Sequence, residues 1–272
     1  MKILISGEGG QGVQIISELL AKAGHKIDLN VSYMPSYGVE QRGGASLAYL
    51  QISKNKIIYP KFNLAEILVA MSNRAVETLE NHVDENSIFI FDCSNIEEEF
   101  INSIRPKVTK FLSIPAREYA NKNLSTKVTN MIFLGAILNY LPEINIDEIK
   151  ALLQEKLKDK KDKSEFLEMD LKAIDYGLAF AKSPQNQELK GTSLKKIEEK
   201  FEDSNKSWQR HPELCKGCGL CIVRCPVKAL SFGNDLNFLG TPMPKIDIDK
   251  CIACGLCQQT CPDGAIKMSK KK

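Results

Sequence analysis

The sequence contains no long hydrophobic run. No stretch of its 272 residues approaches the ~18 consecutive apolar residues that a membrane-spanning helix requires. The N-terminal segment MKILISGEGGQG has a short apolar run followed by glycines. A secretory signal peptide needs a longer apolar segment and a small-residue cleavage site. We therefore expect a soluble, cytoplasmic protein with no membrane partner.

Cysteine is almost absent from residues 1–214, where only Cys93 occurs, whereas eight of the nine cysteines follow. A chain of this length can bury a core without disulfides, so the thiols are not needed for stability. In a reducing cytosol, dense cysteines more often bind metal than form disulfides. Cys93 follows the apolar segment IFIFD and is expected to be a buried, inert thiol.

The positive charge is concentrated at the C-terminal end. Residues 206–272 contain 11 Lys+Arg and 5 Asp+Glu, whereas residues 1–205 contain 26 and 29. A nucleic-acid-binding surface is one explanation for a basic segment. The basic residues, however, alternate with cysteines that would be thiolates, and KDKKDK at 158–163 is typical of a solvated turn. We expect no nucleic-acid partner.

The C-terminal cysteines form an internal repeat. CKGCGLCIVRCP begins at residue 215, and CIACGLCQQTCP begins 36 residues later, at residue 251. Both copies have the spacing C-x2-C-x2-C-x3-C-P, whose first three thiolates hold one cuboidal cluster while the fourth ligates the other cluster of a two-cluster ferredoxin. Zinc sites usually have two separated C-x2–4-C pairs instead. The spacing predicts two 4Fe–4S clusters, one held by Cys215, Cys218, Cys221 and Cys261 and the other by Cys251, Cys254, Cys257 and Cys225.

Residues 206–269 resemble the bacterial dicluster ferredoxins, and all eight ligand positions match. Small residues in the two runs, such as Gly217 and Gly255, let backbone N–H groups approach the cluster sulfurs, which helps to set the reduction potential. We expect a short helix after each run, over Pro226–Leu230 and Pro262–Ile266. Neither predicted cluster has a ligand gap for a substrate, so the function implied is one-electron transfer.

A glycine-rich segment, GEGGQG, joins a predicted strand at Lys2–Ser6 to an amphipathic helix. It fits the dinucleotide pattern G-x-G-x-x-G, and such a turn presents backbone N–H groups to an anion. Val13 and Gln14 stand where a P-loop needs Lys and Ser/Thr. A Rossmann site needs an acid at the end of its second strand, whereas Asp28 precedes that strand. NAD binding is therefore disfavoured, and a turn that only packs helix on strand is the plainer alternative.

Strand-like and helix-like segments alternate through residues 1–182, which predicts an α/β domain with a mainly parallel sheet. The segment PSYGVEQRGG, Pro35–Gly44, is either a plain loop or a ligand loop at the carboxyl edge of the sheet, where Arg42 would meet a phosphate or carboxylate. The polar segment 183–205 is expected to be a linker with a helical piece at Ser193–Phe201. Predicted strands cover Lys2–Ser6, Ile27–Tyr33, Ser46–Ile52, Glu66–Met71, Ser87–Asp92 and Lys110–Ile114; predicted helices cover Asn73–Asn81, Ala116–Lys122, Thr129–Tyr140, Asp147–Lys158 and Ser164–Lys182.

Four segments, GEGGQGV, PSYGVEQRGG, IPAREYA and VTNMIFLGA, together resemble the gamma subunit of the 2-oxoacid:ferredoxin oxidoreductases. These are thiamine-diphosphate enzymes that oxidise 2-oxoacids, and the resemblance covers residues 1–182. One departure is Val39, where family members often have proline. The family's glycine loop corresponds to Gly7, Gly9, Gly10, Gln11 and Gly12, its second loop to Tyr37, Gly38, Arg42, Gly43 and Gly44, and its later pattern to Pro115, Ala116, Asn130, Met131, Gly135 and Ala136.

The small delta subunit of that family is a dicluster ferredoxin, so the chain resembles gamma and delta fused. The resemblance implies an α/β domain at 1–182, a linker at 183–205 and a small α+β ferredoxin domain at 206–272. It also implies an oxidoreductase subunit that helps to form a coenzyme A site, at Gly7–Gly12, and passes electrons through its clusters to a soluble ferredoxin. Partner alpha and beta subunits would bind thiamine diphosphate and Mg²⁺, since this chain lacks the GDG signature followed by Asn.

No catalytic constellation is evident in the sequence. His25, His82 and His211 are isolated, and no Ser-His-Asp or paired-carboxylate pattern is found. We therefore expect no catalysis by the chain alone. Two other hypotheses remain. One is a NAD(P)-binding Rossmann domain fused to a ferredoxin, which would be an autonomous reductase. The other is a stand-alone electron carrier whose α/β half is a docking module.

Overall fold

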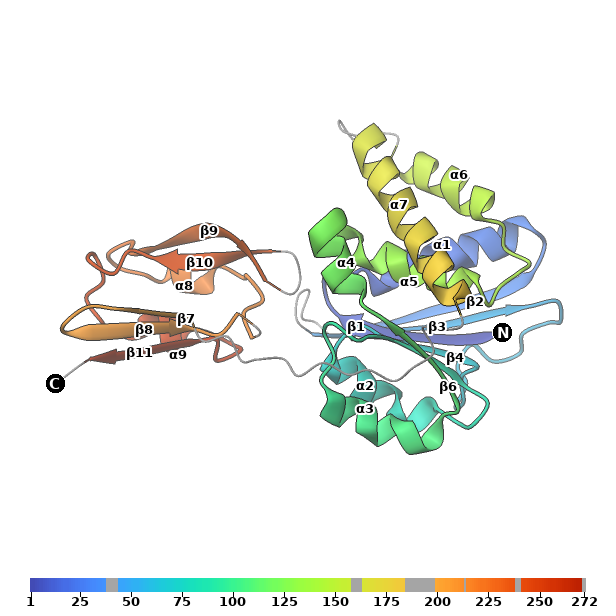
Figure 1. Ribbon diagram of the computed structural model, residues 1–272, viewed down its shortest axis with the longest axis horizontal. Helices are drawn as coiled ribbons and strands as arrows, with labels where there is room; N and C mark the ends of the chain where they lie inside the picture. The colour runs from blue at the N-terminus through green and yellow to red at the C-terminus, as the bar shows by residue number, and fades with distance from the viewer. Residues whose placement is uncertain (38–43, 158–162, 184–198, 213, 238–240, 271–272) are drawn as a thin grey trace. The chain divides into compact units, whose positions relative to one another are not determined.

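The computed structural model describes residues 1–37, 44–157, 163–183, 199–212, 214–237 and 241–270. The chain divides into two compact units, Met1–Leu194 and Lys195–Lys272 (Figure 1). The division falls inside the segment expected to be a linker. None of the helices in these residues is long and apolar enough to cross a membrane.

A six-stranded sheet forms the centre of the N-terminal unit, in the order β2-β3-β1-β4-β5-β6. Strands β1, β4, β5 and β6 pair in parallel, and β3 and β2 extend the sheet in antiparallel pairing. The predicted α/β class with a mainly parallel sheet is confirmed. The strands are β1 (Lys2–Glu8), β2 (Asn30–Tyr37), β3 (Ala45–Ser53), β4 (Ile67–Ala70), β5 (Ile88–Asp92) and β6 (Lys110–Ile114).

Helices cover both faces of this sheet, because alternate side chains of its strands point to opposite sides. Ile3 and Ile5 of β1 pack in one hydrophobic core, and Leu4 packs in the other. Figure 1 shows α2 and α3 on one face and α1, α5, α6 and α7 on the other. The helices are α1 (Val13–Lys26), α2 (Asn73–Leu79), α3 (Glu98–Ile104), α4 (Ala116–Asn123), α5 (Thr129–Leu138), α6 (Ile146–Lys156) and α7 (Lys163–Lys182), with short 3-10 turns at Glu80–His82, Arg105–Lys107 and Thr126–Val128.

Helices α5 and α7 pass each other at two glycines. A Cβ atom on Gly135 would overlap the carbonyl oxygen of Ile174, and one on Gly177 would overlap that of Ile132. The absent side chains therefore allow the two backbones to approach closely. Gly135 belongs to the pattern that carries the family resemblance, and its place in the structure is a packing position.

Two local predictions for the N-terminal unit are wrong. Strand β2 begins at Asn30 and continues to Tyr37, so it includes the first residues of the segment expected to be a loop. Pro35 is tolerated there because β2 is an edge strand. Helix α3 (Glu98–Ile104) was not predicted; its buried residues are Ile101 and Ile104, and seven residues are too few for a clear helical period.

The C-terminal unit is a repeat in three dimensions as well as in sequence. The first half contains strand β8 (Lys206–Arg210), helix α8 (Leu220–Val223) and strand β9 (Leu230–Leu236). The second half repeats this order 36 residues later, with β10 (Pro242–Ile246), α9 (Leu256–Gln259) and β11 (Ile266–Lys270). The halves exchange strands, since β10 pairs with β9 and β11 pairs with β8. The small sheets agree with the expected α+β class.

The short helices of this unit lie elsewhere than expected. Helices were predicted over Pro226–Leu230 and Pro262–Ile266, but α8 and α9 come before the fourth cysteine of each run, and strands begin at Leu230 and Ile266. Gly219 and Gly255, with φ of 76° and 75°, cap the two helices and start them early.

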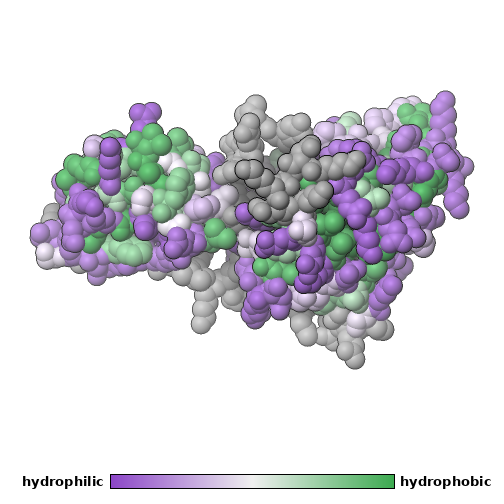
Figure 2. All heavy atoms as spheres, turned by 90° about the horizontal axis from the view of Figure 1, so that it is seen from above, coloured by the Kyte–Doolittle hydropathy of each residue, from purple (hydrophilic) through white to green (hydrophobic). Residues whose placement is uncertain are grey.

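A further strand, β7 (Glu199–Glu202), pairs with β8. The helical piece expected at Ser193–Phe201 is therefore wrong in its described part. Large hydrophobic side chains of the C-terminal unit also reach the surface, among them Val223, Ile252 and Phe232. In Figure 2, hydrophobic side chains gather on the visible face of this unit, which is at the left of the picture.

Candidate functional site

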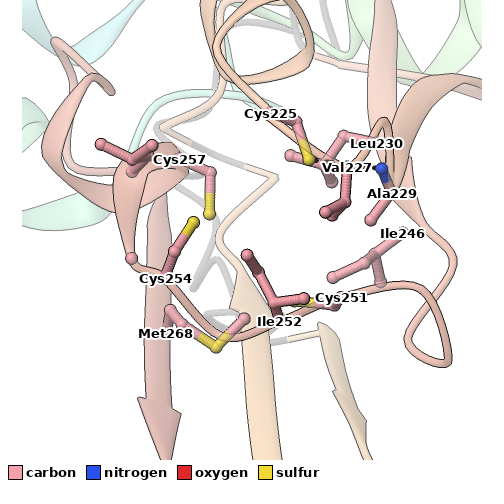
Figure 3. Close-up of a pocket in the computed structure, with 12 residues that line it drawn as sticks. Cys225, Val227, Ala229, Leu230, Ile246, Cys251, Ile252, Cys254, Cys257 and Met268 are labelled. Carbon is pink, nitrogen blue, oxygen red and sulfur yellow. Dashed lines mark hydrogen bonds between the residues drawn. The ribbon is translucent and has the colours of Figure 1, made fainter.

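Two cavities in the C-terminal unit are each lined by four thiols. One, cavity 1, is lined by three cysteines of the first run and by Cys261. The other, cavity 2, is lined by three cysteines of the second run and by Cys225 (Figure 3). Each cavity thus takes its fourth thiol from the other copy of the repeat. The thiols of cavity 1 are Cys215, Cys218, Cys221 and Cys261, and those of cavity 2 are Cys225, Cys251, Cys254 and Cys257.

Local backbone geometry positions the fourth thiols. Each of them follows the short helix of its own run, and a backbone amide four residues later donates to its sulfur. The distances are 3.3 Å from Ala229 N to Cys225 Sγ and 3.2 Å from Ala265 N to Cys261 Sγ. Amide donors of this kind stabilise a thiolate and fix its direction.

The thiols lie in an environment that resists their ionisation. Burial, followed by the repulsion of neighbouring thiols, raises the pKa of Cys221 to about 12. Burial also raises the pKa of Cys215 and Cys257. Four thiolates in one apolar cavity therefore need a cationic partner, and iron in a cluster supplies it. In the described residues no three His, Cys, Asp or Glu side chains converge on a single metal ion. The residues present fit a four-thiolate cluster.

The surroundings of the two cavities differ. Beside cavity 1, Lys216 forms an ion pair with Asp263 at 3.3 Å, and the Asn237 amide donates to the Cys215 carbonyl oxygen at 2.6 Å. Beside cavity 2, Lys206 Nζ donates to the Cys251 carbonyl oxygen at 2.5 Å. Arg210 is also buried in this unit, and its Nη1 donates to the Pro244 carbonyl oxygen at 2.7 Å. Pro244 lines cavity 1, so the guanidinium lies behind one wall of that cavity.

The glycine-rich segment forms a tight turn between β1 and α1. Gly10 and Gly12 have φ of 103° and 78°, a backbone conformation that favours glycine. The turn is closed by Gln11, whose side-chain oxygen accepts from Glu8 N at 2.7 Å. A Cβ on Gly12 would lie 2.8 Å from Asn130 Cγ, so this glycine packs directly on a buried side chain of α5.

The two glycine-containing segments meet. Gly9 N donates to the Gly44 carbonyl oxygen at 2.8 Å, which joins the end of the second segment to the turn. Tyr37 ends β2 and pairs with Ser46 of β3. The other predicted site residues of this segment, Gly38, Arg42 and Gly43, lie outside the described residues.

A chain of polar contacts extends from the turn along the carboxyl edge of the sheet. Gln11 Nε2 and Asn95 Nδ2 both donate to the Met71 carbonyl oxygen, at 3.2 Å and 2.9 Å. Arg117 Nη1 donates to Asn95 Oδ1, and Arg117 N donates to Asp92 Oδ2 at 3.2 Å. In open α/β sheets, ligands bind along this edge. Arg117 was not predicted as a site residue, although its segment IPAREYA follows β6 directly and so begins at this edge.

Asp92 is buried at this edge, and the partly buried Arg117 lies beside it. Burial raises the pKa of Asp92 to about 6, against hydrogen bonds from Ser94 that lower it. Burial lowers the pKa of Arg117 to about 10, while Asp92 and Glu8 oppose this change. A partly buried guanidinium at the same sheet edge as a glycine-rich turn is suited to an anionic ligand group.

The other residues of the family pattern have packing roles. Pro115 caps α4, and Ala116 is fully buried behind it. Asn130 is buried against Gly12. Pro115 and Ala116 therefore position the start of α4, and Asn130 supports the glycine-rich turn. Met131, Gly135 and Ala136 are buried in α5.

The surroundings of Cys93 and His82 indicate structural roles. Cys93 is half-buried, less than expected, and burial raises the pKa of its thiol, which favours the less reactive protonated form. His82 Nδ1 lies 2.8 Å from the Asn63 carbonyl oxygen.

The sheet order argues against a dinucleotide site. In a Rossmann fold the second strand lies parallel to the first and beside it. Here β1 is flanked by the antiparallel β3 and by β4, and β2 is an edge strand separated from β1 by β3. Asp28, the candidate ribose acid, lies in the turn before β2 with φ of 60°.

Comparison with known proteins gives a match for each unit. The family profile described as pyruvate ferredoxin/flavodoxin oxidoreductase matches residues 2–180, and the profile of a 4Fe-4S dicluster domain matches residues 214–265. The 2-oxoglutarate synthase subunit KorC of Methanothermobacter thermautotrophicus is 38% identical over 139 residues, which are 50% of this chain and 74% of the relative. The common gamma subunit of the Pyrococcus abyssi pyruvate/ketoisovalerate oxidoreductases is 25% identical over 57% of this chain and 85% of the relative.

Two solved structures share the fold. One is the 2-oxoglutarate:ferredoxin oxidoreductase of Magnetococcus marinus with 2-oxoglutarate, coenzyme A and succinyl-CoA bound, with a TM-score of 0.59 and 24% identity. The match covers 71% of this chain but only 33% of that longer chain. The other is the gamma subunit of a keto/oxoacid ferredoxin oxidoreductase from Geobacter sulfurreducens, with a TM-score of 0.52 and 21% identity over 66% of this chain and 97% of that chain.

Proposed function

Since the chain belongs to the pyruvate ferredoxin/flavodoxin oxidoreductase family, we propose that it is a fused gamma and delta subunit of a 2-oxoacid:ferredoxin oxidoreductase. The observation that carries this proposal is the pair of four-thiol cavities on the same chain as a gamma-type domain. The relatives of that domain are subunits named for 2-oxoglutarate, pyruvate and ketoisovalerate oxidation.

In this proposal Cys215, Cys218, Cys221 and Cys261 hold one cluster, and Cys225, Cys251, Cys254 and Cys257 hold the other. The support is the lining of the two cavities. A bound 4Fe–4S cluster supplies a one-electron acceptor at each site. The chain's own residues would hold each cluster by four thiolates, donate amide N–H groups to sulfur and exclude water with apolar walls. Because each cluster accepts one electron, electrons would leave the complex one at a time.

The remaining components are assigned to partners. Alpha and beta subunits would bind thiamine diphosphate and Mg²⁺ and cleave the 2-oxoacid, and a soluble ferredoxin in the cytoplasm would accept the electrons. The gamma-type unit would help to form the coenzyme A site, with Gly7, Gly9, Gly10, Gln11 and Gly12 at its phosphate-binding turn. The left-handed glycines before α1 and the partly buried Arg117 at the same edge support an anionic ligand there.

Metal analysis and reconstitution test the proposal. Anaerobically purified chain should contain about eight irons and eight sulfides, as two cuboidal clusters require. The chain should take electrons from dithionite but oxidise a 2-oxoacid with coenzyme A only after thiamine-diphosphate subunits are added. Four irons, or zinc in place of iron, would contradict the cluster assignment. Turnover by the pure chain, or tight NAD(P)H binding, would favour the autonomous reductase.

The coenzyme A site has its own test, Gly9→Val. Gly9 is not among the glycines with positive φ, so a side chain there adds bulk in the turn without forcing a strained backbone. The KM for coenzyme A in the assembled complex should rise, while the iron content stays the same. The melting temperature of the N-terminal unit controls for lost stability. Unchanged use of coenzyme A by a folded, assembled variant would mean that the turn has only a packing role.

A further inference from the structure

Trp208, in the middle of β8, is the only tryptophan in the chain and is completely buried. Its indole Nε1 is a buried donor that makes no hydrogen bond of normal geometry within the described residues. A buried N–H group left without a partner costs about 1–3 kcal/mol. Such a donor in a small unit therefore calls for an acceptor.

The candidate acceptor is the sulfur of a cysteine that is predicted to hold a cluster. Trp208 packs in a hydrophobic cluster that includes Cys225 and Cys257 of cavity 2 and also Cys221 of cavity 1. Burial raises the pKa of the Cys257 thiol, and the indole N–H of Trp208 is the largest influence in the opposite direction. The indole of Trp208 therefore lies in the same packed cluster as this thiol, and its N–H group has no completed hydrogen bond in the described residues. A thiolate bound to iron is a stronger acceptor than a thiol.

The matching position beside cavity 1 cannot supply such a donor. The 36-residue repeat relates Trp208 to Pro244, and their cross-strand partners follow the same offset, since Trp208 pairs with Met268 and Pro244 pairs with Phe232. Figure 3 shows Met268 beside cavity 2, whereas Pro244 lines cavity 1. Proline has no N–H group. The two halves therefore differ at this repeat position, where β8 has an aromatic N–H donor and β10 has proline.

We propose that Trp208 donates a hydrogen bond to Cys257 Sγ when cavity 2 holds its cluster, and that this bond raises the reduction potential of that cluster alone. The proposal rests on the ligand assignment under the proposed function. Reduction adds one electron, and the extra negative charge is shared with the thiolate sulfurs. An N–H donor to sulfur stabilises the reduced form more than the oxidised form, which makes the potential less negative. Trp208 is a positioning and tuning residue and takes no part in proton transfer.

The direct test is Trp208→Phe, which keeps an aromatic ring and removes the donor. At a fixed solution potential, the ratio of reduced to oxidised cavity 2 cluster should fall by as much as about tenfold, which for a one-electron couple is a shift of about 59 mV. The potential of the other cluster should not change. Redox titration followed by electron paramagnetic resonance measures both. Cys254→Ser identifies the cavity 2 signal, because it changes the spectrum of the cluster that Cys254 ligates.

The single tryptophan allows a closer control that leaves the side-chain shape intact. Replacing it during expression with 3-benzothienylalanine substitutes sulfur for the indole N–H, so this protein should reproduce the shift even if Trp208→Phe folds poorly. Indole-¹⁵N tryptophan gives a spectroscopic readout, since only the reduced cavity 2 cluster should show a magnetic coupling to the label. Phe201→Leu is the packing control, because Phe201 contacts the Trp208 ring at 5.7 Å between centroids. It should leave both potentials unchanged.

The outcomes separate this proposal from the ligand assignment. If both clusters are present and neither potential moves in the Trp208→Phe and benzothienyl proteins, the hydrogen bond is absent and the proposal is overturned. A shift of the other cluster, or an equal shift in Phe201→Leu, also overturns it. If the protein does not contain two 4Fe–4S clusters, or Cys254→Ser changes neither signal, the ligand assignment has failed instead.

Discussion

The two units of this chain are stabilised in different ways. The N-terminal unit buries two extensive hydrophobic cores, one on each face of a six-stranded sheet. In the described residues of the C-terminal unit, Lys195–Lys272, the hydrophobic core consists of two small clusters, and cysteines belong to both. Domains of this size often rely on metal or disulfides, because a small core supplies little free energy. The difference indicates that the clusters are part of the core of the second unit.

Removal of iron should produce the largest difference in stability between the two units. Anaerobic treatment of the full chain with ferricyanide and a chelator should abolish amide-exchange protection in β8–β11, because binding free energy of the metal is folding free energy here. Strands β1 and β4–β6 should keep their protection. Persistent protection in β8–β11 after complete loss of iron would show that the C-terminal unit has a sufficient core of its own.

A single cysteine substitution sharpens the same comparison. In Cys225→Ala the signal of the cluster held by Cys251, Cys254 and Cys257 should be lost, and the total iron should fall by about half. Cys93→Ala, in the other unit, should leave the iron content and the spectra unchanged. Loss of the cluster held by Cys215, Cys218 and Cys221 in Cys225→Ala would contradict the crossed ligand sets.

Helices α5 and α7 of the N-terminal unit pack closely at Gly135, and a side chain added there tests this packing. Gly135→Val should destabilise this unit by about 3 kcal/mol, because its Cβ would overlap the Ile174 carbonyl oxygen and force α5 away from α7. Gly264→Ala is the comparison variant in the other unit, where a Cβ has open space. No atom lies within 4 Å of the added Cβ, and its φ of +63° costs about 1 kcal/mol. Urea midpoints of each unit measure both effects, and equal losses would contradict the close approach of α5 and α7.

The smallest expected effect is a pH dependence confined to the N-terminal unit. Because the folded pKa of Asp92 is raised to about 6, the folded state binds a proton more tightly than the unfolded state. Wild type should therefore lose stability relative to Asp92→Asn as the pH rises from about 4 to about 6, by about 1–3 kcal/mol. The difference should be constant above about pH 7. Urea titrations of the two proteins should show these curves; parallel curves across this range would refute the raised pKa.

Local patterns made some features of this chain predictable and tertiary contacts decided the others. The apolar periodicity of β1 and α1 and the cysteine spacing are properties of short segments, so the strand, the helix and the two 4Fe–4S clusters were accessible from sequence. The location of α8 was not, because Gly219 in a left-handed conformation starts the helix before Pro226 is reached. Arg117 was missed because its place at the sheet edge depends on hydrogen bonds to Asp92 and Asn95, which are distant in sequence. Strand β7 forms only by pairing with β8.

The exchange of fourth ligands between the two repeats has a consequence for how the C-terminal unit acquires its cofactors. In the proposed ligation, the chain loop closed between Cys225 and Cys251 is nested inside the loop closed between Cys221 and Cys261. The entropic cost of closing a loop grows with its length, so a cluster that closes the inner loop shortens the free chain that the outer loop must bring together. Insertion of one cluster thereby favours insertion of the second. A population of chains that is short of iron should divide into fully loaded and empty molecules, with few that hold a single cluster.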